Sequence, residues 1–358
     1  MPEFVVNDPE ALEKAKRLVF FAHYDREDIV APHVLWYLDG LRGAGFTIVF
    51  ITTSRLPAAE RDKVRFCAAF HERANDGGRD FSCWKDAFAA FGHLAPELLL
   101  LCNDSVYGPT SDLGRYIDDL TSVDADFYSP VGTSEFARHG QSWFLLLRPA
   151  AYRHPALVEF FRKLDGDAVL SKAQLIDELE VGLSQALMRG GLRLACGYEP
   201  SEAGEISARE PFNAAHLLWR QLIESGASPF LKVDLLRTNP ARVRGLDAWR
   251  PTLMARCPEL VPVVEADLAR LGAPPRPAVK QGMDWVVRTA GSPAYWHLFR
   301  PFLERDFALT RAGDHRGARR NARRYFALRK LAQAPRLPVA AGLALARAAR
   351  GAPPAGAQ

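Results

Sequence analysis

The chain has 358 residues, of which 48% are hydrophobic and 25% are charged. These values are typical of a globular protein and exclude a disordered chain, but they do not separate an enzyme from a binding module. The net charge of +4 is too small to indicate a nucleic-acid-binding protein.

The cysteines and the N-terminus bear on cellular location. The five cysteines are widely spaced and form no C-x-x-C pair, which is typical of reduced thiols in a cytosolic protein. The N-terminus lacks the charged and apolar regions of a secretory signal. No stretch reaches the ~18 consecutive apolar residues of a membrane-spanning helix. We therefore expect a cytoplasmic protein.

The first part of the chain predicts a βαβ unit. Short apolar runs at 18–22 and 47–52 predict two buried strands, and the helical spacing that begins at Pro32 predicts a helix between them. A strand, a helix and a strand in succession favour a parallel sheet with a right-handed crossover. The polar residues that follow these two strands are His23, Tyr24, Asp25 and Ser54.

The rest of the chain continues this alternation. Short apolar runs predict further strands at 98–102, 126–131 and 143–147, the last of them antiparallel. Apolar residues at helical spacing predict helices at 57–70, 81–91, 113–120, 155–164, 172–188, 214–225 and 231–236. A polar loop, 73–85, stands where a third strand and its turn belong. The predicted fold class is α/β, with a mostly parallel sheet flanked by helices.

We expect the chain to divide into four parts. Residues 1–15 form a leader, and residues 16–240 form the α/β domain. Residues 241–350 form a helical region that becomes basic toward its end. Residues 351–358, rich in Ala, Pro and Gly, form a disordered tail.

The loop 73–85 reads R-x-N-x-G-G-R-D-F-x-x-W-K. A glycine such as Gly77 lets the backbone approach a ligand, and Asn75 can hydrogen-bond to a base or a ribose. Asp80 falls near a helix N-terminus, where the helix dipole favours a carboxylate. The alternative is a solvated loop above an aromatic core. The cations that could bind phosphate are Arg73, Arg79 and Lys85.

The strand at 98–102 ends on Asn103, Asp104 and Ser105. Glycosyltransferases of the GT-A type hold a divalent metal on a short acidic motif at such a strand end. Mg²⁺ or Mn²⁺ prefers oxygen ligands and neutralises the leaving diphosphate. The alternative is an ordinary turn, since all three residue types favour turns.

Together these motifs resemble the rhamnan synthesis protein F family, in order over residues 16–239. The resemblance is carried by the loop 73–85 and by F-A-H-Y-D at 21–25, V-F-I-T-T-S at 49–54, L-C-N-D-S-V-Y-G-P at 101–109, H-G-Q-S-W-F at 139–144, E-V-G-L-S at 180–184, N-A-A-H-L-L-W at 213–219 and P-F-L-K at 229–232. It implies a bacterial glycosyltransferase with a GT-A-like, Rossmann-like domain. The donor would be a nucleotide sugar, with dTDP-rhamnose favoured, and the acceptor a polysaccharide, lipopolysaccharide or lipid-linked glycan.

The resemblance also implies roles for individual residues. Nucleotide-sugar contacts fall on His23, Tyr24, Asp25, Ser54, Arg73, Asn75, Gly77, Asp80, Lys85, Asn103 and Asp104. Asp104 would bind the metal, Mg²⁺ or Mn²⁺. The N-D-S turn offers one carboxylate where the D-x-D motif of GT-A enzymes offers two, so basic residues could stabilise the diphosphate instead.

Glu180 is the candidate catalytic residue. In inverting GT-A enzymes an acidic residue at this place in the chain removes the proton of the acceptor hydroxyl, which is typically worth about 10²–10⁴-fold in rate. The alternative is a solvated glutamate on an amphipathic helix. The neighbouring H-x-Q-S element implies acceptor or diphosphate contacts for His139, Gln141 and Ser142, although His139 could simply cap the strand that follows.

The basic segment 315–330 has two interpretations. It could be a solvated helix face, or it could adhere to the anionic inner face of the cytoplasmic membrane, where a lipid-linked acceptor would lie. We expect no nucleic-acid partner, because few aromatic residues interleave the charges. The leading hypothesis is an inverting, rhamnosyltransferase-like enzyme at that membrane. The alternative is a non-catalytic, GT-A-like binding component of a polysaccharide-assembly complex.

Overall fold

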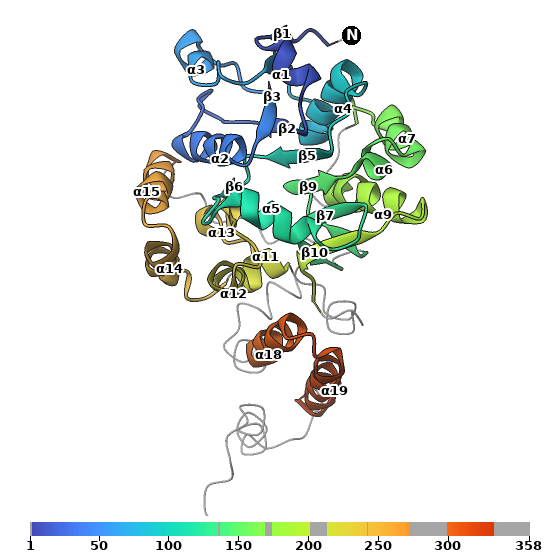
Figure 1. The fold of residues 1–358 in the computed structure, drawn as a ribbon. Helices are drawn as coiled ribbons and strands as arrows, with labels where there is room; N and C mark the ends of the chain where they lie inside the picture. Colours follow the sequence, from blue (N-terminus) through green and yellow to red (C-terminus); the bar gives the residue numbers. More distant parts are fainter. Residues whose placement is uncertain are drawn as a thin grey trace, which may run out of the picture.

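The computed structural model of the chain describes residues 2–134, 137–168, 174–200, 213–241, 243–271 and 299–332 (Figure 1). The predicted α/β class is confirmed: a mostly parallel sheet is flanked by helices. Its strands lie in the order β1-β4-β3-β2-β5-β9-β7-β10, and β8 pairs with β7. The strands of this sheet are β1 (Val5–Val6), β2 (Arg17–His23), β3 (Phe46–Thr52), β4 (Ala69–Glu72), β5 (Leu98–Asn103), β7 (Phe127–Thr133), β8 (His139–Gly140), β9 (Phe144–Leu147) and β10 (Leu194–Tyr198).

The order of the strands creates a switch point between β2 and β5. From β2 the chain continues to β3 and β4 on one side, and then it returns to add β5 on the other side of β2. All of these neighbours pair in parallel, so their carboxyl ends share one edge of the sheet. Helices that cover opposite faces leave a crevice at such a switch point, where ligands bind in open α/β sheets.

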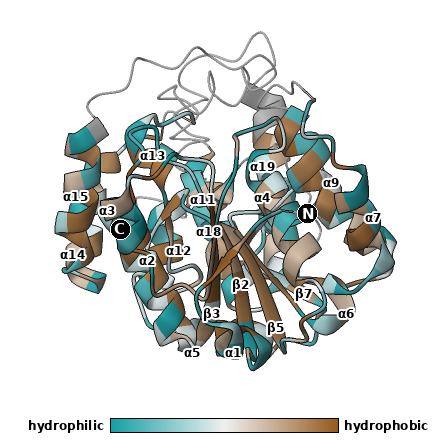
Figure 2. Ribbon diagram, turned by 90° about the horizontal axis from the view of Figure 1, so that it is seen from above, coloured by the Kyte–Doolittle hydropathy of each residue, from teal (hydrophilic) through white to brown (hydrophobic). Residues whose placement is uncertain are grey.

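Alternating side chains of the central strands fill two cores. On β2, Val19 and Phe21 face one core, while Leu18, Phe20 and Ala22 face the other. Because successive strand residues point to opposite faces, a continuous apolar run buries both faces of the sheet. Figure 2 shows these hydrophobic strands between the two helical layers.

The helices on the two faces follow the sequence pattern closely. The first core is covered chiefly by α2 (Pro32–Gly43), α5 (Leu113–Thr121), α11 (Ala214–Leu217), α12 (Trp219–Ser225), α13 (Val233–Arg237), η2 (Leu246–Ala248), α14 (Trp249–Arg256) and α15 (Leu260–Leu271). The second core is covered by α1 (Pro9–Glu13), α4 (Arg79–Phe91), α6 (Pro149–Tyr152), α7 (Pro155–Lys163), the π-helical segment η1 (Leu175–Val181) and α9 (Gly182–Arg189). A short antiparallel pair of strands distant in sequence, β6 (Val106–Tyr107) with β11 (Leu231–Lys232), joins the segment after β5 to the segment before α13.

One helix prediction was wrong. The helix expected at 57–70 is only α3 (Ala58–Asp62), and the third strand, β4, already includes residues 69 and 70. Ala69 pairs with Val49 and is fully buried, so sheet pairing outweighs the helical pattern there. The third strand therefore precedes the loop 73–85. The start of the helix predicted at 172–188 and the tail 351–358 lie outside the described residues.

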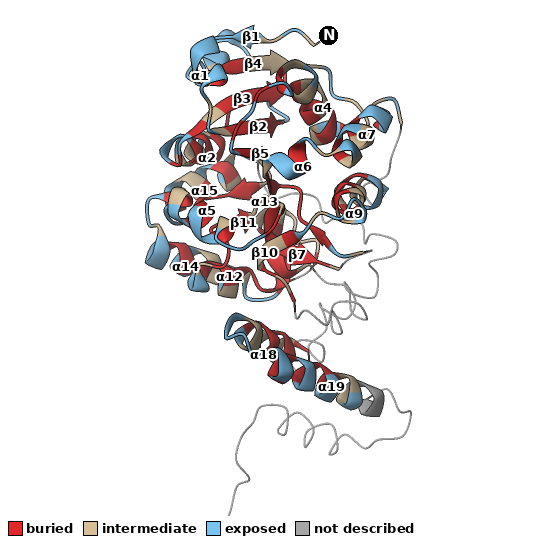
Figure 3. Cartoon of the chain, turned by 45° about the vertical axis from the view of Figure 1, so that its right-hand side comes forward, coloured by how far each residue is buried: buried red, intermediate tan, exposed pale blue. Residues whose placement is uncertain are grey.

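A pair of C-terminal helices packs against the end of the α/β domain. Helix α18 (Arg300–Arg311) and helix α19 (His315–Ala332) bury one face each (Figure 3). The rings of Phe307 and Tyr198 lie 4.7 Å apart, and Gln221 donates to Glu304 over 3.0 Å. In the part of the chain that is described, no helix combines the length and apolarity that crossing a membrane requires.

Candidate functional site

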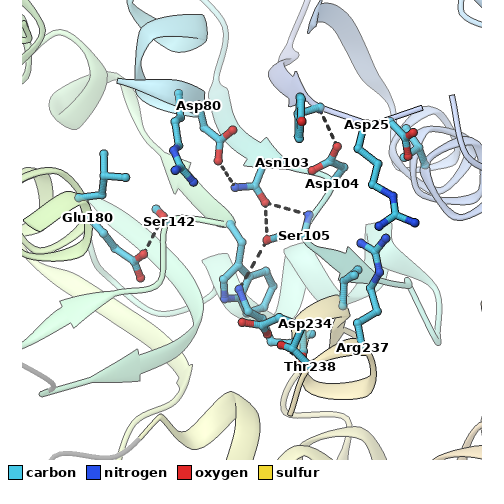
Figure 4. Close-up of a pocket in the computed structure, with 18 of the residues that line it drawn as sticks. Asp25, Asp80, Asn103, Asp104, Ser105, Ser142, Glu180, Asp234, Arg237 and Thr238 are labelled. Carbon is cyan, nitrogen blue, oxygen red and sulfur yellow. Dashed lines mark hydrogen bonds between the residues drawn. The ribbon is translucent and has the colours of Figure 1, made fainter. Parts of the chain in front are cut away.

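A cavity of about 610 Å³ opens at the switch point between β2 and β5 (Figure 4). Its walls come from the carboxyl ends of both strands, the N-terminus of α4, the segment η1, the strand β11 and the helices α13 and α15. Among the predicted site residues, those that line it are Tyr24, Asp25, Asp80, Asn103, Asp104, Ser142 and Glu180. Polar residues from segments far apart in sequence therefore converge on one volume.

The ends of β2, β3 and β5 are tied together by hydrogen bonds. The backbone N–H of Tyr24 donates to Oδ2 of Asp104 over 2.8 Å. The backbone N–H of Asp25 donates to the Ser54 hydroxyl over 2.7 Å, and that hydroxyl donates back to the Asp25 carbonyl. Nδ1 of the buried His23 lies 2.8 Å from the hydroxyl of Thr52. His23 and Ser54 thus stand behind the cavity wall and hold its shape.

The turn after β5 links three walls of the cavity. Oδ1 of Asn103 accepts from the backbone N–H and from the hydroxyl of Ser105, over 3.1 and 2.6 Å. The Asn103 amide donates to Oδ2 of Asp80 over 2.7 Å. Nζ of Lys232 donates to the Ser105 hydroxyl over 3.5 Å. The N-D-S turn is therefore part of a polar network and is more than a chain reversal.

The carboxylates of the cavity repel one another. Burial raises the pKa of Asp104 well above its usual range, and the nearby charges of Asp80 and Asp25 raise it further. Burial also raises the pKa of Asp80, although the hydrogen bond from Asn103 and the charges of Arg79 and Lys232 oppose this. Added positive charge at this place would favour the ionised form of both carboxylates.

The structure does not bring Arg73 to the cavity. Its Nε donates to Asp86 over 2.7 Å and its terminal nitrogen donates to Asp76 over 2.6 Å. Oδ1 of Asp76 in turn accepts from the backbone N–H groups of Gly78 and Arg79, over 3.0 and 3.2 Å. Arg73 therefore fixes the carboxylate that shapes the turn into α4.

The other residues of the loop 73–85 also fall into two groups, those that contact the protein itself or solvent and those that line the cavity. Gly77 approaches the protein's own backbone, since a Cβ atom there would lie 1.9 Å from the carbonyl oxygen of Ala168. Lys85 donates to the Leu164 carbonyl over 2.8 Å, and it lines a separate groove beside α7. Asn75 is exposed and lies outside the cavity lining. Of this loop, Gly78, Arg79, Asp80 and Phe81 line the cavity.

Arg79 occupies a strained position at the start of α4. Its φ angle of +48° lies in the left-handed region, which is unfavourable for a residue with a side chain. The hydrogen bond from its backbone N–H to Oδ1 of Asp76 maintains this conformation. Strain of this kind concentrates at ligand sites, and here it belongs to a cationic residue that lines the cavity at the N-terminus of a 13-residue helix.

Glu180 belongs to the π-helical segment η1, and it lines the same cavity as Asp80. Its Oε2 accepts from the Ser142 hydroxyl over 3.1 Å, and its Oε1 lies 3.5 Å from Nε2 of His139. Burial raises the pKa of the Glu180 carboxyl, but the hydrogen bond and charge of His139, with smaller contributions from Lys232 and Ser142, hold it below its usual value. Glu180 is therefore ionised at neutral pH.

His139 is buried behind Glu180 and does not line the cavity. Its Nδ1 lies 2.8 Å from the carbonyl oxygen of Ala137, which can only accept, so Nδ1 carries a hydrogen. The second ring nitrogen faces a carboxylate, which also only accepts. A protonated imidazole satisfies both neighbours. Gln141 also lies behind the wall, where its amide nitrogen donates to Asn213 over 2.7 Å.

Several cavity residues were not singled out as site residues from the sequence. They are Arg26, His33, Ser105, Trp143, Asp234, Arg237, Thr238, Arg270 and Lys232. Lys232 could have been found from the sequence, since it is the last residue of the P-F-L-K motif that contributes to the family resemblance. Its position is set by the pairing of β11 with β6, where Lys232 lies opposite Val106. Its Nζ lies 5.7 Å from the centre of the Trp143 ring.

Arg270 of α15 closes the cavity beside Asp25. Its guanidinium donates to both Asp25 oxygens over 3.1 and 2.7 Å, and also to Glu27 and Asp267. Asp267 is fully buried and accepts from the Tyr107 hydroxyl over 2.7 Å. The Asp25 carboxylate is thus held by a cation more than two hundred positions away in sequence.

The carboxylates of this cavity could bind a divalent cation only if a ligand, such as a diphosphate, supplied further oxygen atoms to it. Within the described ranges, no group of three or more His, Cys, Asp or Glu side chains is placed to hold a metal ion. The charge of Asp80 raises the pKa of Asp104, and the charge of Glu180 raises that of Asp80, which is the electrostatic setting that a cation relieves. Mg²⁺ is commonly bound by one or two carboxylates and completed by phosphate oxygens.

Comparison with known proteins identifies one family. The profile described as "Rhamnan synthesis protein F" matches residues 48–246, which include the loop 73–85, Asp104, Glu180 and Lys232. No curated protein matches the chain. The crystal structure of residues 1–349 of TarS from S. aureus aligns with a TM-score of 0.31 and 15% identity, over 91% of this chain and 95% of that chain. The fold is defined by the order and direction of the strands in its own sheet.

The division between Arg73 and Arg79 can be tested by stability. Arg73→Met leaves two partly buried carboxylates without their cation, so we expect the free energy of unfolding to fall by about 3 kcal/mol. Arg79→Met removes a charge of the same sign from the cavity wall and should change stability by less than about 0.5 kcal/mol. Urea unfolding followed by circular dichroism measures both. Equal losses in the two variants would contradict the scaffold role of Arg73.

Proposed function

We propose, on the premise that this chain belongs to the rhamnan synthesis protein F family of polysaccharide glycosyltransferases, that the cavity at the switch point is its sugar-transfer site. One observation carries the proposal. The cations Arg79 and Lys232 and the ionised Glu180 surround Asp80 in the same cavity. Transfer from a nucleotide sugar needs such a combination, because positive charge stabilises the departing diphosphate and a carboxylate activates the acceptor.

The diphosphate would lie between Arg79 and Lys232. Arg79 adds its guanidinium to the positive end of the α4 dipole, and Lys232 adds an ammonium from a fixed strand. The backbone of each residue is held before the reaction, that of Arg79 by Asp76 and that of Lys232 by the pairing of β11 with β6. Preorganised charge of this kind stabilises the transition state more than the ground state, because negative charge on the diphosphate grows as its bond to the sugar breaks.

Glu180 would act as the base. Its carboxylate takes the proton of the acceptor hydroxyl, the acceptor oxygen attacks the anomeric carbon, and the bond from that carbon to the diphosphate oxygen breaks. A single displacement of this kind inverts the anomeric configuration. His139 and Ser142 hold the carboxylate in position and keep it ionised. Glu180 thus serves as a catalytic residue and His139 as a positioning residue.

The finer assignments follow the family. We propose dTDP-rhamnose as the donor and a glycan of the cell-surface polysaccharide or lipopolysaccharide type as the acceptor. Tyr24 is 52% exposed at the cavity edge and could stack on the base. Asp104, assisted by Asp80, would hold Mg²⁺ or Mn²⁺ against the diphosphate. When bound, that cation would neutralise part of the charge on the leaving group.

The first prediction separates donor binding from turnover. A nucleotide or nucleotide sugar should raise the melting temperature of the protein, with dTDP-rhamnose expected to act most strongly. Glu180→Gln should keep that shift and lose about 10²–10⁴-fold of turnover. Glu178→Gln is the matched control, because Glu178 is exposed on the same segment. Thermal-shift screening and detection of released nucleotide measure the two effects.

Three outcomes would contradict this proposal at different points. If no nucleotide stabilises the protein, the transferase assignment to this cavity fails. If the donor binds but Glu180→Gln transfers sugar at the native rate, Glu180 is removed from the mechanism. Donor binding without any transfer or hydrolysis would instead favour a non-catalytic binding component.

The second prediction concerns pH. Because His139 holds the pKa of Glu180 down, His139→Gln should move the acidic limb of the kcat/KM profile to higher pH. The sign follows from the role of the base: activity appears as pH rises through the Glu180 pKa, and a higher pKa delays that rise. Ser142→Ala removes a neutral donor and should move the limb less. An unchanged limb in His139→Gln would contradict the positioning role.

The third prediction separates the contribution of the metal to diphosphate binding from that of Lys232. Mg²⁺ should strengthen binding of the nucleoside diphosphate to the native protein but not to Asp104→Asn. Lys232→Met should weaken binding with and without Mg²⁺ by roughly tenfold, as expected for one charge-assisted contact. Isothermal titration with dTDP measures both effects. If the native protein binds dTDP equally well with and without Mg²⁺, the metal has no role in diphosphate binding, and Arg79 and Lys232 alone bind the diphosphate.

A further inference from the structure

Helix α19 presents a row of arginines that the proposed reaction does not use. Arg316, Arg319, Arg320, Arg323 and Arg324 are all exposed. Their spacing of three, one, three and one residues places them on one side of the helix. The helix spans His315–Ala332, and its sequence contains no aspartate or glutamate. We call this row the arginine face.

The opposite side of α19 is fixed to the protein. Ala318, Ala322 and Tyr325 are buried, and the ring of Tyr325 lies 4.9 Å from that of Phe299. The Asn321 amide donates to the backbone carbonyl of Phe302 over 2.8 Å. Figure 3 shows the buried sides of α18 and α19 against each other and the exposed sides turned outward. The packing therefore points the arginine face away from the core.

The arginine face is not neutralised by its surroundings. None of its five side chains forms an ion pair with any residue in the described ranges, whereas arginines on other helices pair locally, as Arg300 does with Glu304 and Arg220 with Glu224. Three pairs within the face stand four positions apart, where like charges oppose helix formation. An anionic partner would relieve this repulsion.

The chemistry favours a lipid surface as that partner. A flat row of cations without acidic neighbours matches the dense negative charge of an anionic bilayer. Single-stranded nucleic acid would need exposed aromatic rings for base stacking, but Tyr325 is only 6% exposed and Phe326 is half-buried. We propose that the arginine face docks the protein on anionic phospholipid membranes.

The proposal is independent of the transferase assignment. It rests on α19 alone, and its test measures binding to lipid and no reaction. If both proposals hold, docking would concentrate the enzyme where a membrane-anchored glycan acceptor is found. Failure of either one leaves the other unaffected.

The test is sedimentation of the full chain with lipid vesicles. We expect binding to vesicles that contain phosphatidylglycerol, little binding to pure phosphatidylcholine, and loss of binding as salt is raised. The triple variant Arg316→Gln, Arg320→Gln and Arg324→Gln should bind about 100-fold more weakly, since each basic residue near such a surface contributes roughly fivefold. All three side chains are exposed, and circular dichroism checks that the helices remain.

A matched control removes the same charge elsewhere. Arg65→Gln, Arg115→Gln and Arg162→Gln change three exposed arginines outside α19 and should leave vesicle binding within about twofold of the native protein. Native affinity in the α19 variant would overturn the proposal, as would an equal loss in the control. Binding of the native protein to single-stranded RNA but not to anionic vesicles would overturn it in favour of a nucleic-acid surface.

Discussion

A half-buried carboxylate at the ends of two paired strands is the constraint on which the cavity depends. Asp104 accepts the backbone N–H of Tyr24 across the gap between β2 and β5. A charge-assisted hydrogen bond of this kind stabilises the half-buried carboxylate and pairs the N–H at the end of β2. One hydrogen bond thus ties the two strand ends together. The segments that complete the cavity are built around that fixed opening.

The charges around the opening are organised in layers. Asp25 and Asp267 are neutralised within the protein by Arg270, and Asp76 and Asp86 by Arg73. In these ion pairs the charges neutralise each other and hold segments of the chain in place. The pKa of Asp104, by contrast, is raised by burial and by the charges of Asp80 and Asp25, while Arg79 and Lys232 face the same volume. A carboxylate with a strongly perturbed pKa in a cavity favours a ligand-binding role for that place.

The sequence predicted what depends on local pattern and missed what depends on packing. Apolar runs were sufficient for β2, β3 and β5, because strands buried on both faces carry an unmistakable signal. The prediction of a helix over 57–70 was wrong because the spacing of apolar residues does not reveal that Ala69 pairs with β3. Lys232 lines the cavity only through the pairing of β11 with β6, and Arg270 only through the packing of α15 beside α2. No local pattern encodes such contacts.

The loop 73–85 shows why a motif does not by itself reveal which residues meet a ligand. Arg73, Gly77 and Lys85 contact carboxylates and carbonyls of the protein itself, whereas Arg79 and Asp80 line the cavity. A cation used for scaffolding needs a fixed anionic partner, whereas a cation used for binding must be left uncompensated until the ligand arrives. Two arginines six positions apart can therefore have opposite roles. The partner of each guanidinium, and not its residue type, decides which role it has.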